Sequence, residues 1–310
     1  MAALPGDDDP VRARVPRGAE PLCGTHSAGL AAAIVSTPSA EAPTVYSGAA
    51  MATIAVLSQK GGTGKTTAVR TLTDIFRRVD LRVLAVDLDP QGNLSDYLDV
   101  DPEAAPTIAD VLSDRAKPAE AVHGGIIPAN LGLAEAELAL GGKMGRELSL
   151  KKALRAVKPD YDVILIDCPP ALGLLTVNAL VAADYALLSA EAQYFALQGV
   201  EQALEVIELA RETLNPDLEW LGVMLNIADM RTRHSREAFD SLREHFGEKL
   251  LDTTIRASIA YAESAERAVS ILDYRPDLAT DYLNVADELL RRLHMDPARE
   301  RLGALVRAAA

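Results

Sequence analysis

Cysteine is nearly absent from this sequence of 310 residues. Cys23 and Cys168 are the two present, and they lie far apart with no paired spacing. Disulfide frameworks and structural zinc sites need several cysteines at short, regular spacings, so the sequence disfavours both. This usage is typical of a protein of the reducing cytosol, and we expect a cytoplasmic location.

Long apolar runs and an excess of positive charge are also lacking. No stretch of 18 or more apolar residues occurs, so the sequence predicts no transmembrane helix. Asp and Glu number 45 against 31 Lys and Arg, which gives a formal net charge of −14 at pH 7. This charge argues against a chain that coats nucleic acid through its overall charge. Any contact with nucleic acid must therefore come from a local group of basic residues.

Residues 1–50 differ from the rest of the chain. They are rich in Ala, Pro, Gly and Ser, carry an acidic cluster at Asp7–Asp9, and show no sustained hydrophobic period. We expect a disordered extension, because such a segment buries too little apolar surface to offset its ordering entropy. The stretch AGLAAAIVSTPSA (28–40) resembles a signal-peptide core, but it is short and weakly hydrophobic. A second interpretation is that translation begins at Met51, directly before an expected strand.

From Met51 onward, short apolar runs alternate with segments of helical spacing. The runs are rich in Val, Ile and Leu, as expected for parallel strands buried on both faces. This alternation predicts an α/β fold with a doubly wound, mostly parallel sheet and helices on both faces. We expect one domain over 51–296, with Pro297 ending its last helix and 297–310 as a tail. The expected strands are 53–57, 82–86, 162–166, 184–189 and 219–225; the expected helices are 65–78, 174–183, 198–213, 233–246 and 281–294.

A glycine-rich loop, SQKGGTGKTT (58–67), joins the first expected strand to the first expected helix. It nearly matches the phosphate-binding P-loop pattern, but Gln59 stands in place of the first glycine. Lys65 should reach the β- and γ-phosphates of a nucleotide, and Thr66 should offer its hydroxyl to Mg²⁺. The glycines let backbone N–H groups turn toward the phosphates, which the helix N-terminus also favours. The predicted nucleotide-binding residues here are Lys60, Gly61, Gly62, Thr63, Gly64, Lys65, Thr66 and Thr67.

Carboxylates follow two further expected strands. In VLAVDLDPQGN (83–93), Asp87 and Asp89 come at the carboxyl end of a strand, where ligands bind in open α/β sheets. Strand alternation would put both on the same face, near a Mg²⁺–phosphate centre. In YDVILIDCPP (161–170), Asp167 ends an apolar strand, the arrangement of a Walker B acid that helps to hold Mg²⁺. A solvated loop or a helix cap is the alternative for the first pair.

The segments SQKGGTGKTT, VDLDPQGN and VILIDCPPALGLLTVNAL resemble the ParA/MinD class of P-loop ATPases. EAQYFALQGV and IRASIAYAESAERAVSILDYRPD make the sequence more similar to the ParA/Soj partition ATPases. The resemblance covers about residues 51–294. It implies ATP and Mg²⁺ as cofactors, a homodimer formed with ATP, slow hydrolysis, and stimulation by a ParB-like partner.

The resemblance also implies roles for particular residues. Lys60 corresponds to a signature lysine that crosses the dimer interface to the partner's nucleotide, where Gly61 would also lie. Asp89 corresponds to the acid needed for hydrolysis, with Asp87 in support, and both are predicted to be catalytic with Lys60. Thr66, Asp167 and Asp89 are the expected metal ligands. Asn226 would lie near the adenine, although a turn residue at a strand end is an equal alternative.

Members of this family bind DNA nonspecifically as ATP dimers, and the resemblance extends this expectation to a basic segment. In ADMRTRHSRE (228–237), Arg231 corresponds to a DNA-contacting arginine, and Arg233 and Arg236 lie close by. Such contacts to phosphates are blind to sequence and sensitive to salt. One departure is at 255–265, IRASIAYAESA, where Ala260 replaces a family arginine; Arg267 and Arg275 are alternative basic positions. An exposed basic helix start without a ligand is the other interpretation.

Several alternatives remain at this level. The cargo could be chromosome or plasmid DNA, which implies a nucleoid-associated protein, or a non-DNA cargo such as a protein organelle or a receptor cluster. A MinD-like, membrane-associated ATPase would need a C-terminal amphipathic anchor. The tail offers only Leu302, Leu305 and Val306, so we expect no membrane partner. A switch without hydrolysis is a further alternative. Iron–sulfur reductases of this fold need two cysteines, and the domain has one.

Overall fold

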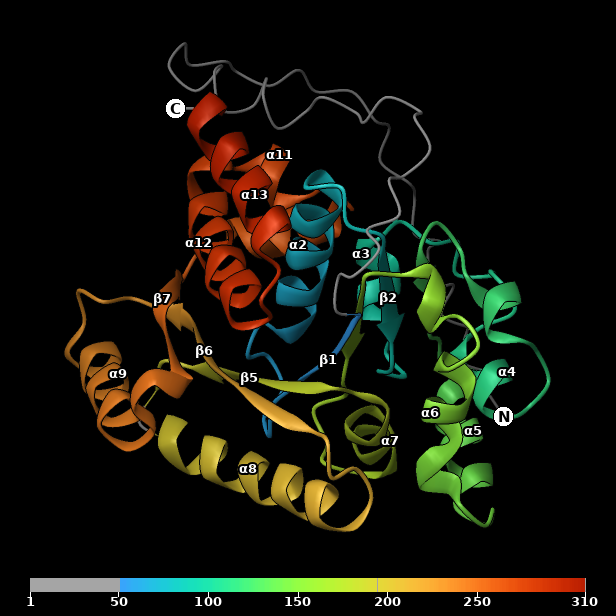
Figure 1. The fold of residues 1–310 in the computed structure, drawn as a ribbon. Helices are drawn as coiled ribbons and strands as arrows, with labels where there is room; N and C mark the ends of the chain where they lie inside the picture. Colours follow the sequence, from blue (N-terminus) through green and yellow to red (C-terminus); the bar gives the residue numbers. More distant parts are fainter. Residues whose placement is uncertain (1–50, 194, 310) are drawn as a thin grey trace, which may run out of the picture.

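The computed structural model describes residues 51–193 and 195–309, so the extension expected at 1–50 lies outside the described residues. The described chain forms a seven-stranded sheet with the order β3-β2-β4-β1-β5-β6-β7, in which all neighbouring strands are parallel (Figure 1). This confirms the predicted fold class. The strands are β1 (Ala52–Leu57), β2 (Val83–Asp87), β3 (Ile126–Ile127), β4 (Val163–Asp167), β5 (Tyr185–Glu191), β6 (Glu219–Ala228) and β7 (Leu250–Arg256).

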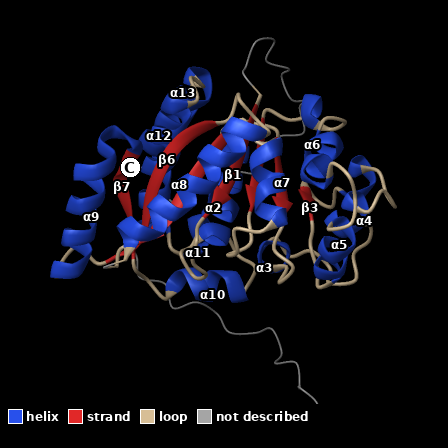
Figure 2. Cartoon of the chain, turned by 90° about the horizontal axis from the view of Figure 1, so that it is seen from below, coloured by secondary structure: helices blue, strands red, loops and turns tan. Residues whose placement is uncertain are grey.

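Helices cover both faces of the sheet (Figures 1 and 2). In Figure 1, α2, α12 and α13 lie above it, and α7 and α8 lie below it. The α-helices are α2 (Lys65–Arg78), α3 (Asn93–Tyr97), α4 (Ile108–Leu112), α5 (Gly132–Leu140), α6 (Ser149–Leu154), α7 (Leu174–Ala182), α8 (Ala196–Thr213), α9 (Arg233–Phe246), α10 (Ala260–Glu266), α11 (Ile271–Tyr274), α12 (Pro276–Arg292) and α13 (Asp296–Ala309). Short 3₁₀ helices occupy Pro118–Ala121, Arg146–Leu148, Lys158–Asp160 and Gly247–Lys249.

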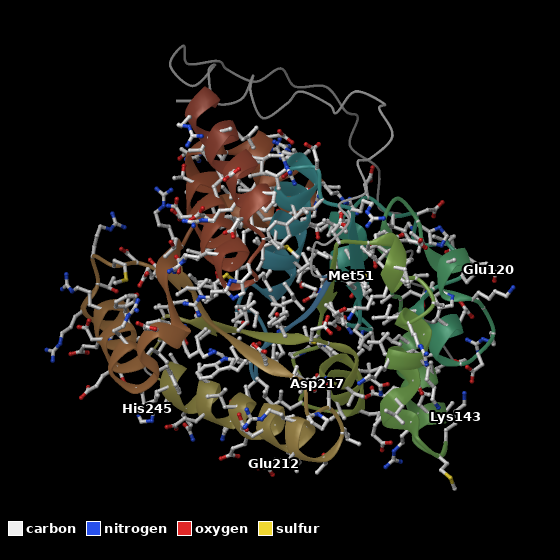
Figure 3. The ribbon with its side chains drawn as sticks, viewed as in Figure 1. Met51, Glu120, Lys143, Glu212, Asp217 and His245 are labelled. Carbon is white, nitrogen blue, oxygen red and sulfur yellow. The ribbon has the colours of Figure 1, made fainter. Side chains whose placement is uncertain are left out.

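The apolar strands are buried on both faces because their side chains alternate between two cores. In β1, Ile54 and Val56 belong to the core between the sheet and the helices α2 and α12. Ala55 and Leu57 belong to the core between the sheet and the helices α7 and α8. β1 lies between β4 and β5, so it is central to the sheet. Figure 3 shows side chains filling the space on both sides of the sheet, while Lys143, Glu212 and His245 point outward. The loop after β1 is thereby held on a rigid, fully buried strand.

The C-terminal segment differs from the prediction. Residues 296–309 form the helix α13, not an unstructured tail, and Pro297 is its second residue. A proline is tolerated in the first turn of a helix because the N–H group there has no partner within the helix. Ala298 and Leu302 are buried in the same core as α12, and Arg301 Nε donates to Val79 O at the end of α2. The prediction that Pro297 begins a tail was therefore wrong.

The five expected strands and five expected helices are present with small shifts of their ends. The sequence reasoning missed β3, which has two residues, and β7, which lies at the edge of the sheet. It also missed several short helices, of which α3 and α10 border the candidate site. None of the helices described is both long enough and apolar enough to cross a membrane.

Candidate functional site

The glycine-rich loop lies between β1 and α2, as predicted. Gly62 and Gly64 have φ angles of 75° and 81°, in the left-handed region that glycine adopts without strain. A Cβ atom at Gly64 would also lie only 3.2 Å from Nδ2 of Asn226. The backbone angle at position 64 thus favours glycine, and a larger residue there would also have to displace the side chain of Asn226 slightly.

Lys65 is directed into the loop. Its side chain is largely buried, and Nζ donates to Ser58 Oγ at 2.9 Å and to Lys60 O at 3.5 Å. Burial lowers the pKa of Lys65, and the nearby carboxylate of Asp167 opposes that shift. The loop therefore folds around this ammonium group, which lies at the helix N-terminus where a phosphate binds in P-loops.

Thr66 and Asp167 meet beneath the loop. Thr66 Oγ1 donates to Asp167 Oδ2 at 2.7 Å, and Asp167 pairs with Val56 of β1 through the parallel register of β4. Asp167 is fully buried, and its Oδ1 atom has no hydrogen-bond partner. Burial, followed by the charge of Asp87, raises the pKa of Asp167 to about 8. A buried carboxylate oxygen without a partner, beside a hydroxyl, fits the donor set of a hard cation such as Mg²⁺.

Asp87 and Asp89 have different surroundings. Asp87 ends β2 and is fully buried, with Oδ2 accepting from Ser95 N and Ser95 Oγ, and Oδ1 accepting from Asp89 N. Burial raises the pKa of Asp87 to about 6, although these hydrogen bonds lower it in part. Asp89 lies past the end of the strand, in the turn before α3, and it lines the cleft described below. Asp87 thus holds the turn in place, and Asp89 is the carboxylate directed to the cleft.

A cleft of about 720 Å³ opens beside the loop. Ligand sites for small molecules commonly have volumes of about 300–1,000 Å³, so the cleft is large enough for a nucleotide. Among the described residues, no group of three or more His, Cys, Asp or Glu is placed to hold a metal ion. Mg²⁺ usually binds through one or two carboxylates together with substrate phosphates. The cleft is lined by Gly61, Gly62, Thr63, Gly64, Lys65, Thr66, Thr67, Asp89, Gln91, Asn93, Asp96, Tyr97, Pro170, Asn226, Ile227, Ile255, Arg256, Ser258, Tyr261, Ala262, Ala265, Glu266 and Tyr282.

Lys60 has a different environment from Lys65. Its side chain is 65% exposed, and Nζ donates to Glu191 Oε2 at 3.2 Å and to Gln193 Oε1 at 3.1 Å. Gly61 has room on its own chain, since a Cβ atom there would meet only Pro170, at 3.7 Å. One lysine of the loop is therefore enclosed, and the other is held at the surface by residues at the end of β5.

Asn226 braces the loop from β6. Its Nδ2 atom donates to Thr63 O at 2.9 Å and to Ser189 Oγ at 2.7 Å, while its buried Oδ1 atom has no partner. Asn226 also lines the cleft. The structure thus places it beside the phosphate loop, and the predicted contact with adenine stays a prediction.

Of the three predicted DNA-binding arginines, Arg231 lies in the loop between β6 and α9, and Arg233 and Arg236 lie in the first turn of α9. Arg231, with a side chain 91% exposed, donates from Nε and Nη2 to the carboxylate of Asp229. Arg233 pairs with Glu237, and Arg236 is exposed. The two alternative arginines also have partners: Arg275 pairs with Asp277, and Arg267 lies over the ring of Tyr274. None of these five lines the cleft, so they form no part of the nucleotide site.

Sequence reasoning missed several residues that border the site. Glu191 and Gln193 hold Lys60, while Ser95 and Tyr97 of α3 and Ser264 of α10 support the turn and the cleft wall. Only Glu191 had a usable signal in the sequence, since it lies at the carboxyl end of a parallel strand, and ligands of open α/β sheets bind outside these strand ends.

The sequence matches a family model described as an AAA domain over residues 51–220. The sporulation initiation inhibitor protein Soj of Bacillus subtilis is 37% identical over 245 residues, which cover 76% of this chain and 97% of Soj. The chromosome partitioning protein ParA of Myxococcus xanthus is 34% identical over 248 residues, which cover 77% of this chain and 88% of that protein.

Two solved structures are similar over most of their length. A McdA variant of Cyanothece in complex with ATP has a TM-score of 0.72 and 26% identity, covering 79% of this chain and 98% of that one. The septum site-determining protein MinD of Pyrococcus horikoshii, complexed with Mg-ADP, has a TM-score of 0.64 and 26% identity, covering 77% and 95%. The architecture described above is thus shared with proteins whose structures hold ATP or Mg-ADP.

Proposed function

This chain belongs to the ParA/Soj family of P-loop ATPases, and from that premise we propose that it is an ATPase whose dimerisation is controlled by ATP. ATP and Mg²⁺ bind in the cleft beside the glycine-rich loop. Lys65 and the backbone N–H groups of the loop bind the phosphates, and Asn226 lies toward the base. Thr66, Asp167 and Asp89 would hold Mg²⁺, which when bound neutralises negative charge on the phosphate oxygens.

Hydrolysis needs an oriented water molecule and positive charge near the transferring phosphoryl group. Asp89 orients the water, because of the two carboxylates at the end of β2 it is the one that lines the cleft, and Asp87 fixes the turn that carries it. Lys60 supplies the positive charge to the nucleotide of a second copy of the chain. An arginine that acts in trans in related reactions contributes about 10³–10⁵ in rate, which sets the scale for Lys60.

We propose that the ATP-bound dimer is the DNA-binding state and that it binds DNA nonspecifically through Arg231, Arg233 and Arg236. A ParB-like partner then stimulates hydrolysis of ATP, which returns the protein to the state that does not bind DNA. The function supported best is therefore segregation of chromosome or plasmid DNA, with the protein associated with the nucleoid. The similarity to Soj of Bacillus subtilis and to the chromosome partitioning protein ParA of Myxococcus xanthus supports this proposal.

The observation that carries the proposal is the contrast between the two loop lysines: Lys65 is enclosed, and Lys60 is exposed. Lys60→Ala should leave binding of ATP within about threefold of wild type, because an exposed lysine held by side chains outside the loop contributes little to a bound phosphate. The same change should abolish dimerisation with ATP and hydrolysis. Calorimetry, sedimentation velocity and phosphate release measure the three properties.

Two control variants complete this experiment. Lys65→Ala should lose ATP binding itself, since it removes the enclosed cation of the loop. Lys152→Ala removes an exposed lysine of α6, outside the nucleotide cleft, and should change nothing. If Lys60→Ala dimerises and hydrolyses ATP like the Lys152→Ala control, the proposed role of Lys60 in trans is wrong.

The similarity to MinD favours a second candidate, positioning of a cargo other than DNA. A membrane-associated version would use the C-terminal helix as an anchor. Leu302, one of its three large apolar side chains, is already buried in the core, which leaves α13 little apolar surface for a bilayer. Sedimentation with anionic vesicles in the presence of ATP distinguishes the two. Binding to vesicles and not to random duplex DNA would select the second candidate.

A further inference from the structure

Tyr97 lies where three helices that border the cleft come together. It ends α3 and is almost completely buried. Arg70 of α2 donates from Nε to the backbone oxygen of Tyr97 at 3.1 Å, and its guanidinium group lies 5.5 Å from the centre of the Tyr97 ring. On the third side, the hydroxyl group of Tyr97 lies 2.5 Å from Ser264 Oγ of α10. Figure 2 shows α3 and α10 along the same edge of the molecule.

The direction of the hydrogen bond between Tyr97 and Ser264 follows from the neighbouring groups. Ser264 Oγ also donates to the backbone oxygen of Tyr261, at 2.9 Å. A serine hydroxyl has a single proton, so Tyr97 is the donor in the shorter contact. Ser264 is fully buried, so loss of its hydroxyl leaves the Tyr97 donor inside the protein without a partner.

On one side, this hydrogen bond is connected to the turn that carries Asp89. Ser95 lies two residues before Tyr97 in the same short helix, and its N and Oγ atoms both donate to Asp87. Asp87 in turn accepts from the backbone N–H of Asp89. A displacement of α3 at Tyr97 therefore acts through only two further side chains on the position of Asp89.

On the other side, this hydrogen bond is connected to the short helix α10. α10 has seven residues and lines the cleft with Tyr261, Ala262, Ala265 and Glu266. Ala260 of α10 is buried in a small cluster with Ile271 and Leu278, and Tyr261 packs edge-on against Tyr282 and donates to Leu278 O. The hydrogen bond between Tyr97 and Ser264 is the buried polar contact that joins α10 directly to α3.

We propose that Tyr97 and Ser264 are positioning residues for hydrolysis: their hydrogen bond couples α10, a wall of the nucleotide cleft, to the turn that holds Asp89. A nucleotide that contacts α10 then also fixes the turn. This inference rests on the proposed ATPase function, because Asp89 is taken there as the group that orients water. Neither residue touches the reacting atoms, so both act through the turn.

The test compares Tyr97→Phe, Ser264→Ala and the double variant with wild type. Each single variant should lower kcat for ATP by about three- to tenfold, the size expected for one hydrogen bond. KM should stay within about twofold, and the double variant should be no slower than the worse single variant, because both remove the same interaction. Tyr274→Phe is the matched control. It also removes a tyrosine hydroxyl bound to α10, at Glu263 Oε2, but has no connection to α3, and it should leave kcat unchanged.

Hydrogen exchange provides a readout that does not need hydrolysis. In wild type, Mg-ADP should protect the amides of both α10 and α3. In Ser264→Ala it should protect α10 as in wild type but α3 less, because only the direct contact of α3 with the cleft then remains. The proposal is overturned if kcat of both single variants equals that of Tyr274→Phe, or if α3 is protected equally in wild type and Ser264→Ala. A wild-type protein that releases no phosphate would instead contradict the proposed function, and the exchange result would still decide the coupling.

Discussion

The Nζ atom of Lys60 lies 3.2 Å from Oε2 of Glu191 in the same chain. Glu191 ends β5, and Gln193 nearby accepts a second hydrogen bond from Lys60. These two contacts must break before Lys60 can reach the nucleotide of a second copy of the chain. The pair is partly exposed, and exposed ion pairs contribute only about 0.2–1 kcal/mol, so this competition is weak enough to be reversed by ATP.

Glu191→Gln should strengthen dimerisation in the presence of a nonhydrolysable ATP analogue, by up to about fivefold in the dissociation constant, since it removes the charge that holds Lys60. Sedimentation equilibrium measures the constant, and the gain should shrink as salt is raised. Glu201→Gln is the matched control, because Glu201 is an exposed glutamate of α8 that faces His245 rather than Lys60. Weaker dimerisation of Glu191→Gln would show that Glu191 acts in the dimer itself.

Asn226→Ala should destabilise the protein and weaken nucleotide binding together. The change removes the two hydrogen bonds that Nδ2 donates, to Thr63 O and to Ser189 Oγ, and each contributes about 0.5–1.5 kcal/mol; Thr63 O keeps the hydrogen bond from Ser189 Oγ. Urea unfolding measures the loss of stability, and calorimetry with Mg-ADP measures binding. Asn215→Ala is the control, since Asn215 is also a buried asparagine that bonds backbone oxygens but does not line the cleft. A variant at 226 that loses stability but binds Mg-ADP normally would exclude a role of Asn226 in supporting the loop.

The unfolding free energy of the nucleotide-free protein should fall as the pH rises from about 4 to 8. Burial raises the folded-state pKa values of Asp87 to about 6 and of Asp167 to about 8, so the folded state holds more protons than the unfolded state in this window. Stability from such groups is complete below the unfolded pKa and is lost as the pH rises through the folded pKa, at up to about 1.4 kcal/mol per pH unit for each proton.

Asp167→Asn tests this dependence, because the amide cannot ionise. Its unfolding free energy should decrease less than that of wild type between pH 6 and 8, as measured by urea unfolding at each pH. Asp162→Asn serves as the comparison, since hydrogen bonds from Arg82 outweigh burial there and leave the pKa of Asp162 lowered. An equal slope for wild type and Asp167→Asn would contradict the raised pKa.

Binding to DNA should respond to Arg231 and to its partner in opposite directions. Arg231→Ala should weaken binding of the ATP-loaded protein to random duplex DNA and reduce the slope of log K against log salt by about two, as expected for the loss of one phosphate contact from each protomer of the dimer. Asp229→Asn removes the carboxylate that Arg231 now faces and should strengthen binding. Fluorescence anisotropy at several salt concentrations measures both. An affinity for DNA that changes neither with ATP nor with the two substitutions would show that Arg231 and Asp229 have no role in DNA binding.

Local sequence patterns were sufficient for the central strands and for the loop. β1, β2 and β4 are runs of Val, Ile and Leu that any buried parallel strand needs, and G-K-T-T between a strand and a helix has one common structural meaning. Because ligands bind at the carboxyl ends of parallel strands, the positions of Asp87, Asp89 and Asp167 at strand ends were enough to predict that they lie near the loop.

The patterns failed where an element depends on distant partners. β7 is an edge strand whose residues alternate weakly, and α13 is rich in alanine with a proline in its first turn. Neither segment shows its place in the fold until β6 pairs with one and the helices α12 and α2 pack against the other. Secondary structure that depends on such tertiary contacts has little local signal.

By itself, the sequence determined that the chain has a phosphate loop with two lysines and three strand-end carboxylates, because backbone conformation and strand direction depend on local residue types. Only the tertiary structure decided what each of these groups faces. It separated an enclosed Lys65 from an exposed Lys60 held by Glu191, separated Asp87 in the turn from Asp89 at the cleft, and joined Tyr97 to Ser264 across 167 positions of the chain. These pairings depend on how the sheet brings distant strand ends and helices to one edge, and no short stretch of sequence contains that information.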